Sequence, residues 1–543
     1  MLAAQALTIR GMSRSFNTAG PCVQGDHYML DPLARLDVDE VLRLIDDKRY
    51  FVLHAPRQTG KTTSLLALMK RLNHEGRYRA LYANIEAAQA LRGDVERGLE
   101  VVCQDIAEAC RLHLSDPSLK TWLASEGHVV GPGARLQQLL RHWSEQDPSH
   151  PTVLLLDEVD ALVGDTLISL LRQIRAGYAD RPAAFPQSLV LCGVRDVRDY
   201  RIHTASQEII TGGSAFNIKA ESLRLGNLSR DECVALWMQH QDETGQTFDP
   251  AIWPELWEDT RGQPWLVNAL GYECTIKDRA ARDRSVPITL ERYKAARERL
   301  IQSRATHLDQ LTDKLREPRV HRLITAFLEG DAVLSSVPID DQQYVEDLGL
   351  ICTRPEIAIS NRIYREVIPR ELTWTTQTFI THQQAWYLTP ERRLHMPKLL
   401  EAFQQFFREH SDAWIEGFSY REAGPQLLMQ AFLQRIVNGG GRISREYGLG
   451  WKRTDLFIEW PVDEAQGFNG PMQRIVIELK LVKKAPEAQE RQGLEQTAGY
   501  ARQVGADEAH LVLFDRRPEV PWEARIWQRE AVQDGVRILV WGA

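Results

Sequence analysis

A Gly-Lys-Thr segment near the N-terminus has the residues and the setting of a phosphate-binding loop. The run 55–62 (APRQTGKT) follows the apolar run 50–54 (YFVLH) and precedes a helical pattern over 63–72. Glycine allows a tight turn, so that successive backbone N–H groups face a phosphate. Lys61 supplies a positive charge for the β- and γ-phosphate oxygens, and Thr62 supplies a hydroxyl for Mg²⁺. The first position of the motif, usually glycine, is alanine here.

Two adjacent acids end another apolar run and supply the second half of a nucleotide site. The run Val153-Leu-Leu-Leu156 leads directly into Asp157 and Glu158. A carboxylate at the C-terminal tip of a buried strand is suited to hold Mg²⁺ through water, and the acid after it can polarise an attacking water. A glycine turn with unrelated surface acids is the alternative interpretation. The presence of both segments in this order favours a nucleotide site.

The residues expected to contact the nucleotide or its Mg²⁺ are Ala55, Gln58, Thr59, Gly60, Lys61, Thr62, Thr63, Asp157 and Arg195. Within this set, Thr62 and Asp157 are the expected Mg²⁺ ligands, and Glu158 beside them is the expected catalytic acid.

A second group of charged residues interrupts apolar runs near the C-terminus. Asp455 opens one such run (DLFI), and Glu478 and Lys480 lie inside another (IVIELK). Because side chains alternate along a strand, Glu478 and Lys480 share one face and Leu479 is buried on the other. Charges inside an apolar strand carry a desolvation penalty, so the pattern indicates a site. A structural ion pair between Glu478 and Lys480 is the alternative.

These residues have the chemistry of metal-dependent phosphodiester cleavage. The carboxylates of Asp455 and Glu478, together with the carbonyl oxygen of Leu479, form a hard-oxygen set suited to Mg²⁺, with Mn²⁺ as a substitute. The metal would polarise a phosphodiester and lower the pKa of a bound water. Lys480 would position that water or neutralise the developing charge.

Composition limits the classes of function. The 543 residues hold 66 Lys and Arg against 74 Asp and Glu, a formal charge of −8, so nucleic acid must be met by a local basic patch. The basic residues around the second site are Arg442, Arg445, Lys452, Arg453, Lys483 and Lys484. They form either a phosphate-tracking surface or a solvated rim. No apolar run approaches the roughly 18–20 residues that span a bilayer. The seven scattered cysteines favour reduced thiols in a cytoplasmic protein.

The spacing of apolar runs predicts the elements that position the first site. Strand-like runs at 50–54, 78–85, 152–156 and 188–192 alternate with helical stretches, including one over 94–123. This alternation predicts a parallel sheet with helices on both faces. Beyond residue 213, Ser229-Arg-Asp-Glu232 reads as a capping box before a helix over 233–240.

Two further regions follow these helices. Helical runs at 322–328 and 344–350 with a β-wing over 350–359 form a winged-helix pattern. The C-terminal part mixes helices and strands again. Helices are expected at 396–410, 425–437 and 487–504, and strands at 454–460, 474–481 and 509–514.

The first site and its surroundings resemble the archaeal-type ATPases of the AAA/STAND branch. The resemblance rests on residues 16–62, on the strand ending in Asp157-Glu158, and on the run 261–267 (RGQPWLV). It implies that Phe16–Tyr28 lies near the adenine and that the Gly-x-Pro element belongs to a helical lid. It also implies that Arg195 is a polar sensor and that the chain forms a homo-oligomer.

The C-terminal region from about 414 to 543 resembles the PD-(D/E)xK nuclease family. The residues that carry the resemblance are Glu422, the run Asn438–Gly450, Asp455, Glu478-Leu-Lys480, and Gln496 with Tyr500. The resemblance implies that Glu422 is an additional helix acid and that Asp455 and Glu478 bind metal. It further implies that Lys480 is catalytic and that Gln496 belongs to the supporting helix.

These observations predict an α/β multidomain protein. The expected parts are a P-loop AAA-type ATPase core over 1–212, a helical lid over 213–316, a winged-helix-like domain and linker over 317–385, and a restriction-endonuclease-like α/β domain over 386–543. The expected function is an ATP-controlled, metal-dependent nuclease acting on DNA rather than RNA, with a role in defence against foreign DNA as an extension. The alternative is an ATPase switch or scaffold whose terminal domain binds nucleic acid or a partner without cutting it.

Overall fold

The computed structural model divides the chain into two compact units. One consists of Met1–Ala296 with Glu346–Cys352, and the other of Arg297–Val345 with Thr353–Ala543. The residues that the structure describes are 14–91, 93–194, 201–203, 209–211, 219–303, 314–315, 317–329, 337–354, 357–368, 387–417, 428–430, 432–433, 441–446, 455–463, 466, 468, 470–482, 486–515, 517 and 520–543. None of the described helices is long and apolar enough to cross a membrane. All seven cysteines are free thiols.

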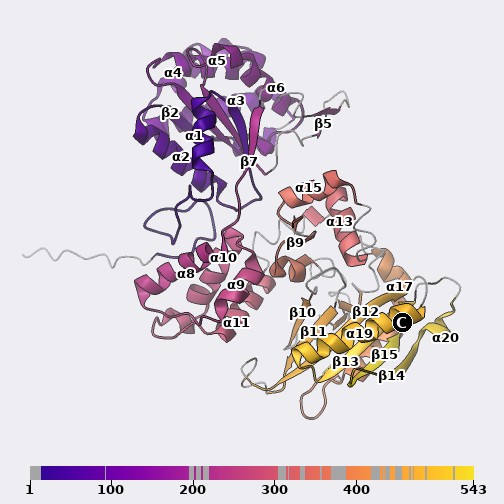
Figure 1. The fold of residues 1–543 in the computed structure, drawn as a ribbon. Coiled ribbons are helices and arrows are strands. Elements are labelled where there is room, and N and C mark those ends of the chain that lie inside the picture. Colours follow the sequence, from indigo (N-terminus) through magenta and orange to yellow (C-terminus); the bar gives the residue numbers. More distant parts are fainter. Residues whose placement is uncertain are drawn as a thin grey trace, which may run out of the picture. The chain divides into compact units, whose positions relative to one another are not determined.

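The first unit is built on a five-stranded parallel sheet in the order β2-β3-β4-β1-β7 (Figure 1). Its strands are β1 (Tyr50–His54), β2 (Arg79–Asn84), β3 (Thr152–Asp157), β4 (Ser188–Gly193) and β7 (Lys219–Arg224). Every residue of β1, β3 and β4 is buried, as expected for parallel strands covered on both faces. The sheet predicted from the alternating runs is therefore confirmed.

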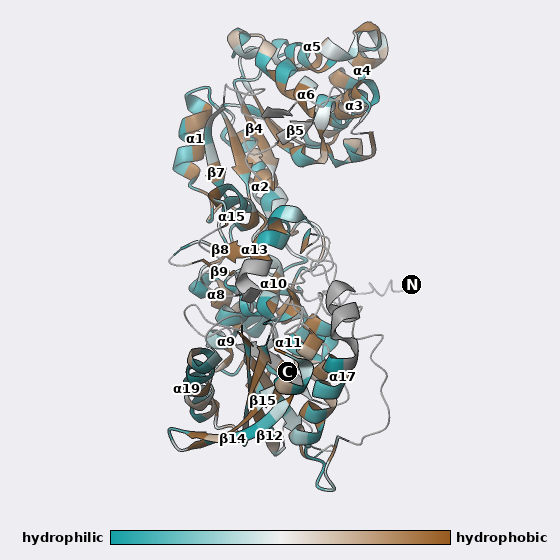
Figure 2. Cartoon of the chain, turned by 90° about the vertical axis from the view of Figure 1, so that its right-hand side faces the viewer, coloured by the Kyte–Doolittle hydropathy of each residue, from teal (hydrophilic) through white to brown (hydrophobic). Residues whose placement is uncertain are grey.

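Helices cover both faces of this sheet. On one face lie α1 (Val38–Asp46) and α2 (Lys61–Glu75), which share a core with Phe51 and Leu53 of β1. On the other lie α3 (Val95–Leu114), α4 (Ser118–Ser125), α5 (Pro132–Glu145) and α6 (Gly164–Ala176). Val52 of β1 belongs to that second core, because successive strand residues face opposite sides. Figure 2 shows these strands mostly in brown, the colour of apolar residues.

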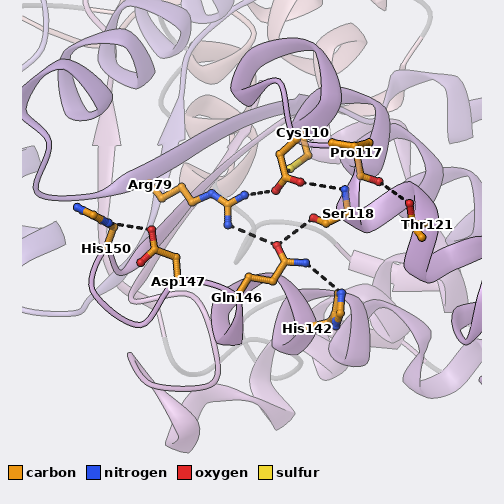
Figure 3. A network of polar contacts seen from close by, with 10 residues as sticks. Arg79, Cys110, Pro117, Ser118, Thr121, His142, Gln146, Asp147 and His150 are labelled. Carbon is orange, nitrogen blue, oxygen red and sulfur yellow. Dashed lines mark hydrogen bonds and ion pairs between the residues drawn. The ribbon is translucent and has the colours of Figure 1, made fainter.

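The helical stretch expected over 94–123 is broken into α3 and α4. Ser115 ends α3 in the left-handed region with φ 53°, and Pro117 precedes α4, where its ring fits the start of a helix. A polar network holds the break against β2 (Figure 3). Arg79 at the start of β2 forms an ion pair with Asp116, and the hydroxyl of Ser118 donates to Gln146 Oε1 at 2.9 Å.

Short elements complete this sheet domain. The 3₁₀ turns span Glu86–Leu91, Gly127–Val129, Val159–Ala161 and Tyr178–Asp180, and an antiparallel pair is formed by β5 (Arg201–His203) and β6 (Ile209–Thr211).

A group of helices follows β7. It contains α8 (Arg230–Thr244), α9 (Ile252–Thr260), α10 (Pro264–Tyr272), a π-helical turn (Glu273–Lys277), a 3₁₀ turn (Ala280–Arg282) and α11 (Leu290–Gln302). The predicted capping box is present: the Glu232 N–H donates to Ser229 Oγ at 3.2 Å, and the Ser229 N–H donates to Glu232 Oε2 at 2.7 Å. An aromatic cluster of Phe16, Tyr28 and Trp237 ties the N-terminal segment to α8.

The second unit begins with small helical and strand elements. It includes α13 (Pro318–Glu329), most of α15 (Ile339–Asp347) and β9 (Ala358–Ile359). The last two residues of α15 and all of β8 (Ile351–Cys352) belong to the first unit. Arg319 and Arg322 of α13 both form ion pairs with Asp341 of α15. The identity of this region as a winged helix stays a prediction.

The C-terminal region is a six-stranded mixed sheet in the order β10-β11-β12-β13-β15-β14 (Figure 1). Its elements are α17 (Met396–Gly417), β10 (Arg442–Glu446), β11 (Asp455–Pro461), β12 (Met472–Val482), α19 (Pro486–Val504), β13 (Glu508–Asp515), α20 (Trp522–Arg525), β14 (Trp527–Gln533) and β15 (Val536–Gly542). The pairs β12–β13 and β13–β15 are parallel, and the other neighbours are antiparallel.

Two helices sandwich this sheet. Phe403 and Phe407 of α17 contact the ring of Phe514 on β13, with centroids 6.1 and 5.4 Å apart. A Cβ built on Gly493 of α19 would lie 2.7 Å from the side chain of Leu511 on the same strand. Because residues 511 and 514 differ by an odd number, they face opposite sides of the sheet. α17 and α19 therefore cover opposite faces of the sheet. α17 extends beyond the helix predicted over 396–410 and ends at Gly417.

Candidate functional site

The loop between β1 and α2 has the shape that phosphate binding requires. Gly60 occupies the N-cap of α2 with φ 90°, in the region that only glycine adopts without strain. Gln58 also has a positive φ of 57°. The hydroxyl of Thr59 donates to the carbonyl oxygen of Pro56 at 2.7 Å and closes the turn. The first N–H groups of α2 are therefore available to an anion at the start of the helix.

Lys61 is held inside this loop. Its side chain is 6% exposed, and its Nζ donates to the carbonyl oxygens of Ala55 and Pro56, both at 3.0 Å. These partners are neutral, so the ammonium group retains its charge for a phosphate that enters the loop. Ala55, which stands in place of the usual glycine, is fully buried.

The predicted acid of β3 lies directly against the loop helix. The hydroxyl of Thr62 donates to Asp157 Oδ2 at 2.8 Å, and the hydroxyl of Tyr82 donates to the same oxygen at 3.0 Å. Asp157 is fully buried. The sequence reasoning placed Thr62 and Asp157 in one site but missed Tyr82, whose position on β2 next to β3 follows only from the strand order. Hydroxyl and carboxylate oxygens at this place fit a Mg²⁺ ion.

Glu158 has a backbone and an electrostatic setting that differ from those of an ordinary surface acid. Its φ of 60° lies in the left-handed region, and its N–H donates to Asp157 Oδ1 at 3.0 Å. Burial, followed by the nearby negative charge of Asp160, raises the pKa of its carboxyl group to about 7, although Lys61 opposes the shift. A carboxylate with such a pKa is a suitable proton acceptor near neutral pH.

The N-terminal segment expected near the adenine bridges the loop helix and the helices after β7. The Cys22 N–H donates to the hydroxyl oxygen of Thr63 at 3.1 Å. The Asn17 N–H donates to Asn268 Oδ1 at 3.2 Å, and the indole N–H of Trp265 donates to the carbonyl oxygen of Thr18 at 2.9 Å. This segment therefore connects α2 with α10.

The Gly-x-Pro element links the start of α10 to the segment between β7 and α8 through a close backbone contact. Gly262 has φ 73°, and a Cβ built there would lie 1.8 Å from the carbonyl oxygen of Leu228. The Leu228 N–H donates to the Gly262 carbonyl at 2.9 Å. Pro264 occupies the first turn of α10, where a missing N–H is tolerated. Only glycine fits at position 262, because a side chain there would collide with the backbone of Leu228.

A further basic residue near the loop was not foreseen. A Cβ built on Gly60 would lie 2.8 Å from Nη2 of Arg35. Arg195, the expected sensor, lies outside the described residues. The strand before it, β4, runs beside β1. At the end of β4, the Ala55 N–H donates to the Gly193 carbonyl oxygen at 3.2 Å.

In the C-terminal sheet, three of the predicted residues come together. Lys480 Nζ contacts both the carboxylate of Glu478 and the side-chain oxygen of Gln496 on α19. The side chains of Glu478 and Lys480 are 1% and 0% exposed. Leu479 between them is buried on the other face of β12. Tyr500, one turn after Gln496, stacks edge-on against Phe457 at 6.5 Å.

The strand register places Asp455 next to this group. Leu456 of β11 pairs with Ile477 of β12, so continuing the antiparallel register by one residue sets Asp455 opposite Glu478. The structure describes only the backbone of Asp455, and Glu422 lies outside the described residues. Among the described side chains, no group of three His, Cys, Asp or Glu could hold a metal ion. The side chains of the six basic residues expected around the site also lie outside the described part.

Comparison with known proteins supports one part of the chain with a family model. Residues 44–200 match the family described as AAA domain. The chain is similar to the Walker-type ATPase of Pyrococcus abyssi, with TM-score 0.46 and 14% identity over 65% of this chain and 99% of that chain. It is also similar to Cdc6p from Pyrobaculum aerophilum, with TM-score 0.33 and 19% identity over 63% of this chain and 93% of that chain.

Domain III of the replication initiation protein DnaA from Thermotoga maritima matches with TM-score 0.31 and 12% identity, over 49% of this chain and 92% of that chain. A search of curated proteins found no match to this chain. The family match, together with the strand order and the loop geometry, shows a P-loop ATPase domain of the AAA type over 44–200.

Proposed function

Starting from an AAA-type ATPase domain over 44–200, we propose that this protein binds and hydrolyses ATP to control a metal-dependent nuclease in its C-terminal sheet. The observation that carries the first part is the hydrogen bond between Thr62 and Asp157, which unites the loop helix with the acid of β3. The observation that carries the second is the contact of Lys480 with Glu478 and Gln496, with Asp455 opposite Glu478 in register.

The nucleotide step follows from the residues around the loop. Lys61 would exchange the carbonyl oxygens of Ala55 and Pro56 for β- and γ-phosphate oxygens. Glu158 would accept the proton of the attacking water. Bound Mg²⁺, for which Thr62 and Asp157 would be the ligands, supplies positive charge against the phosphate oxygens.

Control requires an element whose position depends on the nucleotide. The N-terminal segment joins Thr63 to Asn268 and Trp265, so a ligand at the start of α2 changes contacts that reach the helical lid. The differential contacts of ATP and ADP would favour different lid positions. We propose that the winged-helix-like region passes this difference on, and that the active form is a homo-oligomer.

The cutting step is assigned to the C-terminal site. Asp455 and Glu478, with Glu422 in support, would hold Mg²⁺ or Mn²⁺, which polarises a phosphodiester when bound. Lys480 would stabilise the negative charge that develops on the phosphate, and Gln496 would fix the ammonium group of Lys480. DNA is the proposed substrate in preference to RNA, and a role in defence against foreign DNA is the proposed context.

The test is incubation of purified protein with duplex DNA, single-stranded DNA and RNA, with Mg²⁺ or Mn²⁺, with and without ATP. Asp455→Asn should abolish cleavage and leave ATP hydrolysis intact, whereas Lys61→Ala should abolish nucleotide binding. Lys398→Ala, an exposed lysine of α17, and Lys70→Ala, an exposed lysine of α2, are the matched controls. ATP turnover that survives Lys61→Ala would disprove the loop assignment.

A second function is favoured by one observation. Glu478 and Lys480 are almost completely buried and engage each other, which is also the arrangement of a structural ion pair. The protein would then be an ATPase switch or scaffold whose terminal domain binds nucleic acid or a partner without cutting. Wild-type protein that cuts none of the three polymers under every condition, yet retains ATPase activity, would establish this alternative.

A further inference from the structure

Arg35 lies against the phosphate-binding loop although no motif includes it. A Cβ built on Gly60 would lie 2.8 Å from Nη2 of Arg35, so the guanidinium group fills the space that the glycine leaves open. Nη1 donates to the carbonyl oxygen of Gly226 at 2.9 Å, in the segment between β7 and α8. One guanidinium group therefore contacts both the loop and the connection to the lid.

The turn that carries Arg35 is fixed in place. The hydroxyl of Ser64, in the first turns of α2, donates to the carbonyl oxygen of Pro32 at 2.8 Å. The Leu33 N–H donates to Asp31 Oδ1 at 3.0 Å, and Leu33 is part of the core beneath α1 and α2. The backbone of the turn is thus tied to the same helix that begins at the loop. Arg35 is pre-organised there, which lowers the entropy that a ligand contact loses.

The charge of Arg35 has no acidic partner among the described residues. Its hydrogen bond goes to the neutral carbonyl of Gly226. The carboxylate of Glu232 lies near enough to interact electrostatically with Arg35, but it accepts the hydrogen bond of the capping box of α8. Burial lowers the pKa of the guanidinium group, with Glu232 and Cys22 opposing that shift. A half-buried cation that pairs with no carboxylate is less favourable than one whose site an anion completes. Guanidinium is the side chain best suited to bind phosphate oxygens.

We propose that Arg35 is a second phosphate-binding cation, which contacts an oxygen of the diphosphate portion that ATP and ADP share. In the proposed function Lys61 and Glu158 act at the terminal phosphate, whereas Arg35 lies beside Gly60 and holds Gly226, in the connection between β7 and α8. This inference rests on the nucleotide-binding part of the proposed function. Because Arg35 also holds Gly226, occupancy by either nucleotide would fix the lid connection.

The test is the dissociation constant for ATP, ADP and adenosine by titration calorimetry, with four proteins. Arg35→Met removes the charge and keeps the length of the side chain. Arg35→Lys keeps the charge and loses the fork. Arg43→Met, an exposed arginine of α1, is the matched control, and wild type is the reference.

Arg35→Met should weaken ATP and ADP by the same factor, about tenfold or more, and leave adenosine unchanged. Arg35→Lys should fall between it and wild type. Without nucleotide, the melting temperature of Arg35→Met should not fall, because an uncompensated charge has been removed.

Unchanged affinity for both nucleotides, in Arg35→Met or in Arg35→Lys, would overturn the inference. A loss confined to ATP would also overturn it, because the contact would then be with the terminal phosphate. The proposed function fails separately, if wild type binds neither ATP nor ADP.

Discussion

Both regions of this molecule bury a lysine beside an acid, but they do so in different ways. Lys61 is the first residue of α2, directly after the loop that follows β1, and its partners are two backbone carbonyls. Lys480 sits inside a strand, and its partners are the side chains of Glu478 and Gln496. A backbone partner is present whatever the neighbouring side chains are. A carboxylate partner makes each charge depend on the other.

The two regions should therefore respond differently to substitution. Substitutions around Lys61 should change nucleotide chemistry more than stability, because the loop is fixed by its own backbone turn. Substitutions around Lys480 should change the stability of the C-terminal sheet itself, because removal of one partner leaves a buried charge.

The largest effect is expected at the buried ion pair. Glu478→Ala leaves Lys480 without its carboxylate inside the sheet, and removing one partner of such a pair is worth about 3–5 kcal/mol of unfolding free energy. Urea unfolding followed by circular dichroism measures the loss. Glu487→Ala, an exposed acid on α19, is the control and should change the unfolding free energy by less than about 0.5 kcal/mol. A small loss for Glu478→Ala would remove the contrast between the two lysines.

The next effect is catalytic and belongs to the first unit. Glu158→Gln removes the proposed proton acceptor while keeping the shape of the side chain, so ATP turnover should fall by about 10²–10⁴-fold. The affinity for ATP should stay within a few-fold of wild type. Steady-state hydrolysis and equilibrium binding measure the two quantities. Asp160→Asn, whose charge helps to raise the pKa of Glu158, is the comparison and should reduce turnover far less. Equal losses in both variants would argue against Glu158 as the base.

Lys61→Met should change stability only slightly. The two hydrogen bonds to Ala55 and Pro56 are worth about 1 kcal/mol each, and loss of the desolvated charge offsets them. Thermal unfolding without nucleotide is the measurement, and the stabilisation that ATP gives wild type should vanish in the variant. A loss of stability comparable with that of Glu478→Ala would show that both lysines are structural.

The smallest effect concerns the contact between the N-terminal segment and α8. Burial lowers the pKa of His240, which also lies near Arg284 and Glu243 and contacts Tyr28 at 3.1 Å and Gln246 at 2.8 Å. Since the folded pKa is below the ordinary value of 6.5, the unfolded chain takes up the proton first.

The stability that His240 contributes to the first unit should therefore be fully present above pH 6.5 and should decline as the pH falls toward the folded pKa. Melting temperatures between pH 7.5 and 5 test this sign. His240→Gln should flatten the profile, whereas substitution of the exposed His150 should not. A profile that stays equally steep in His240→Gln would assign the decline to other groups.

Local sequence patterns predicted parts of both sites. The loop 55–62 and the acids Asp157-Glu158 were visible as short runs at the ends of apolar strands, because a phosphate site uses backbone that is adjacent in sequence. The parallel sheet and the capping box at Ser229 follow from the same kind of local signal, and both are present. The shared face of Glu478 and Lys480 follows from the two-residue period of a strand, and the structure has it.

Sequence patterns thus identify the groups whose geometry depends on neighbours along the chain. The tertiary structure alone decided which distant groups complete them. Tyr82 reaches Asp157 because β2 lies beside β3, and Arg35 reaches Gly60 because its turn is tied to α2. Gln496 reaches Lys480 because α19 covers that face of β12. Strand order and helix placement arise from burial of apolar surface summed over whole faces, which no local run encodes.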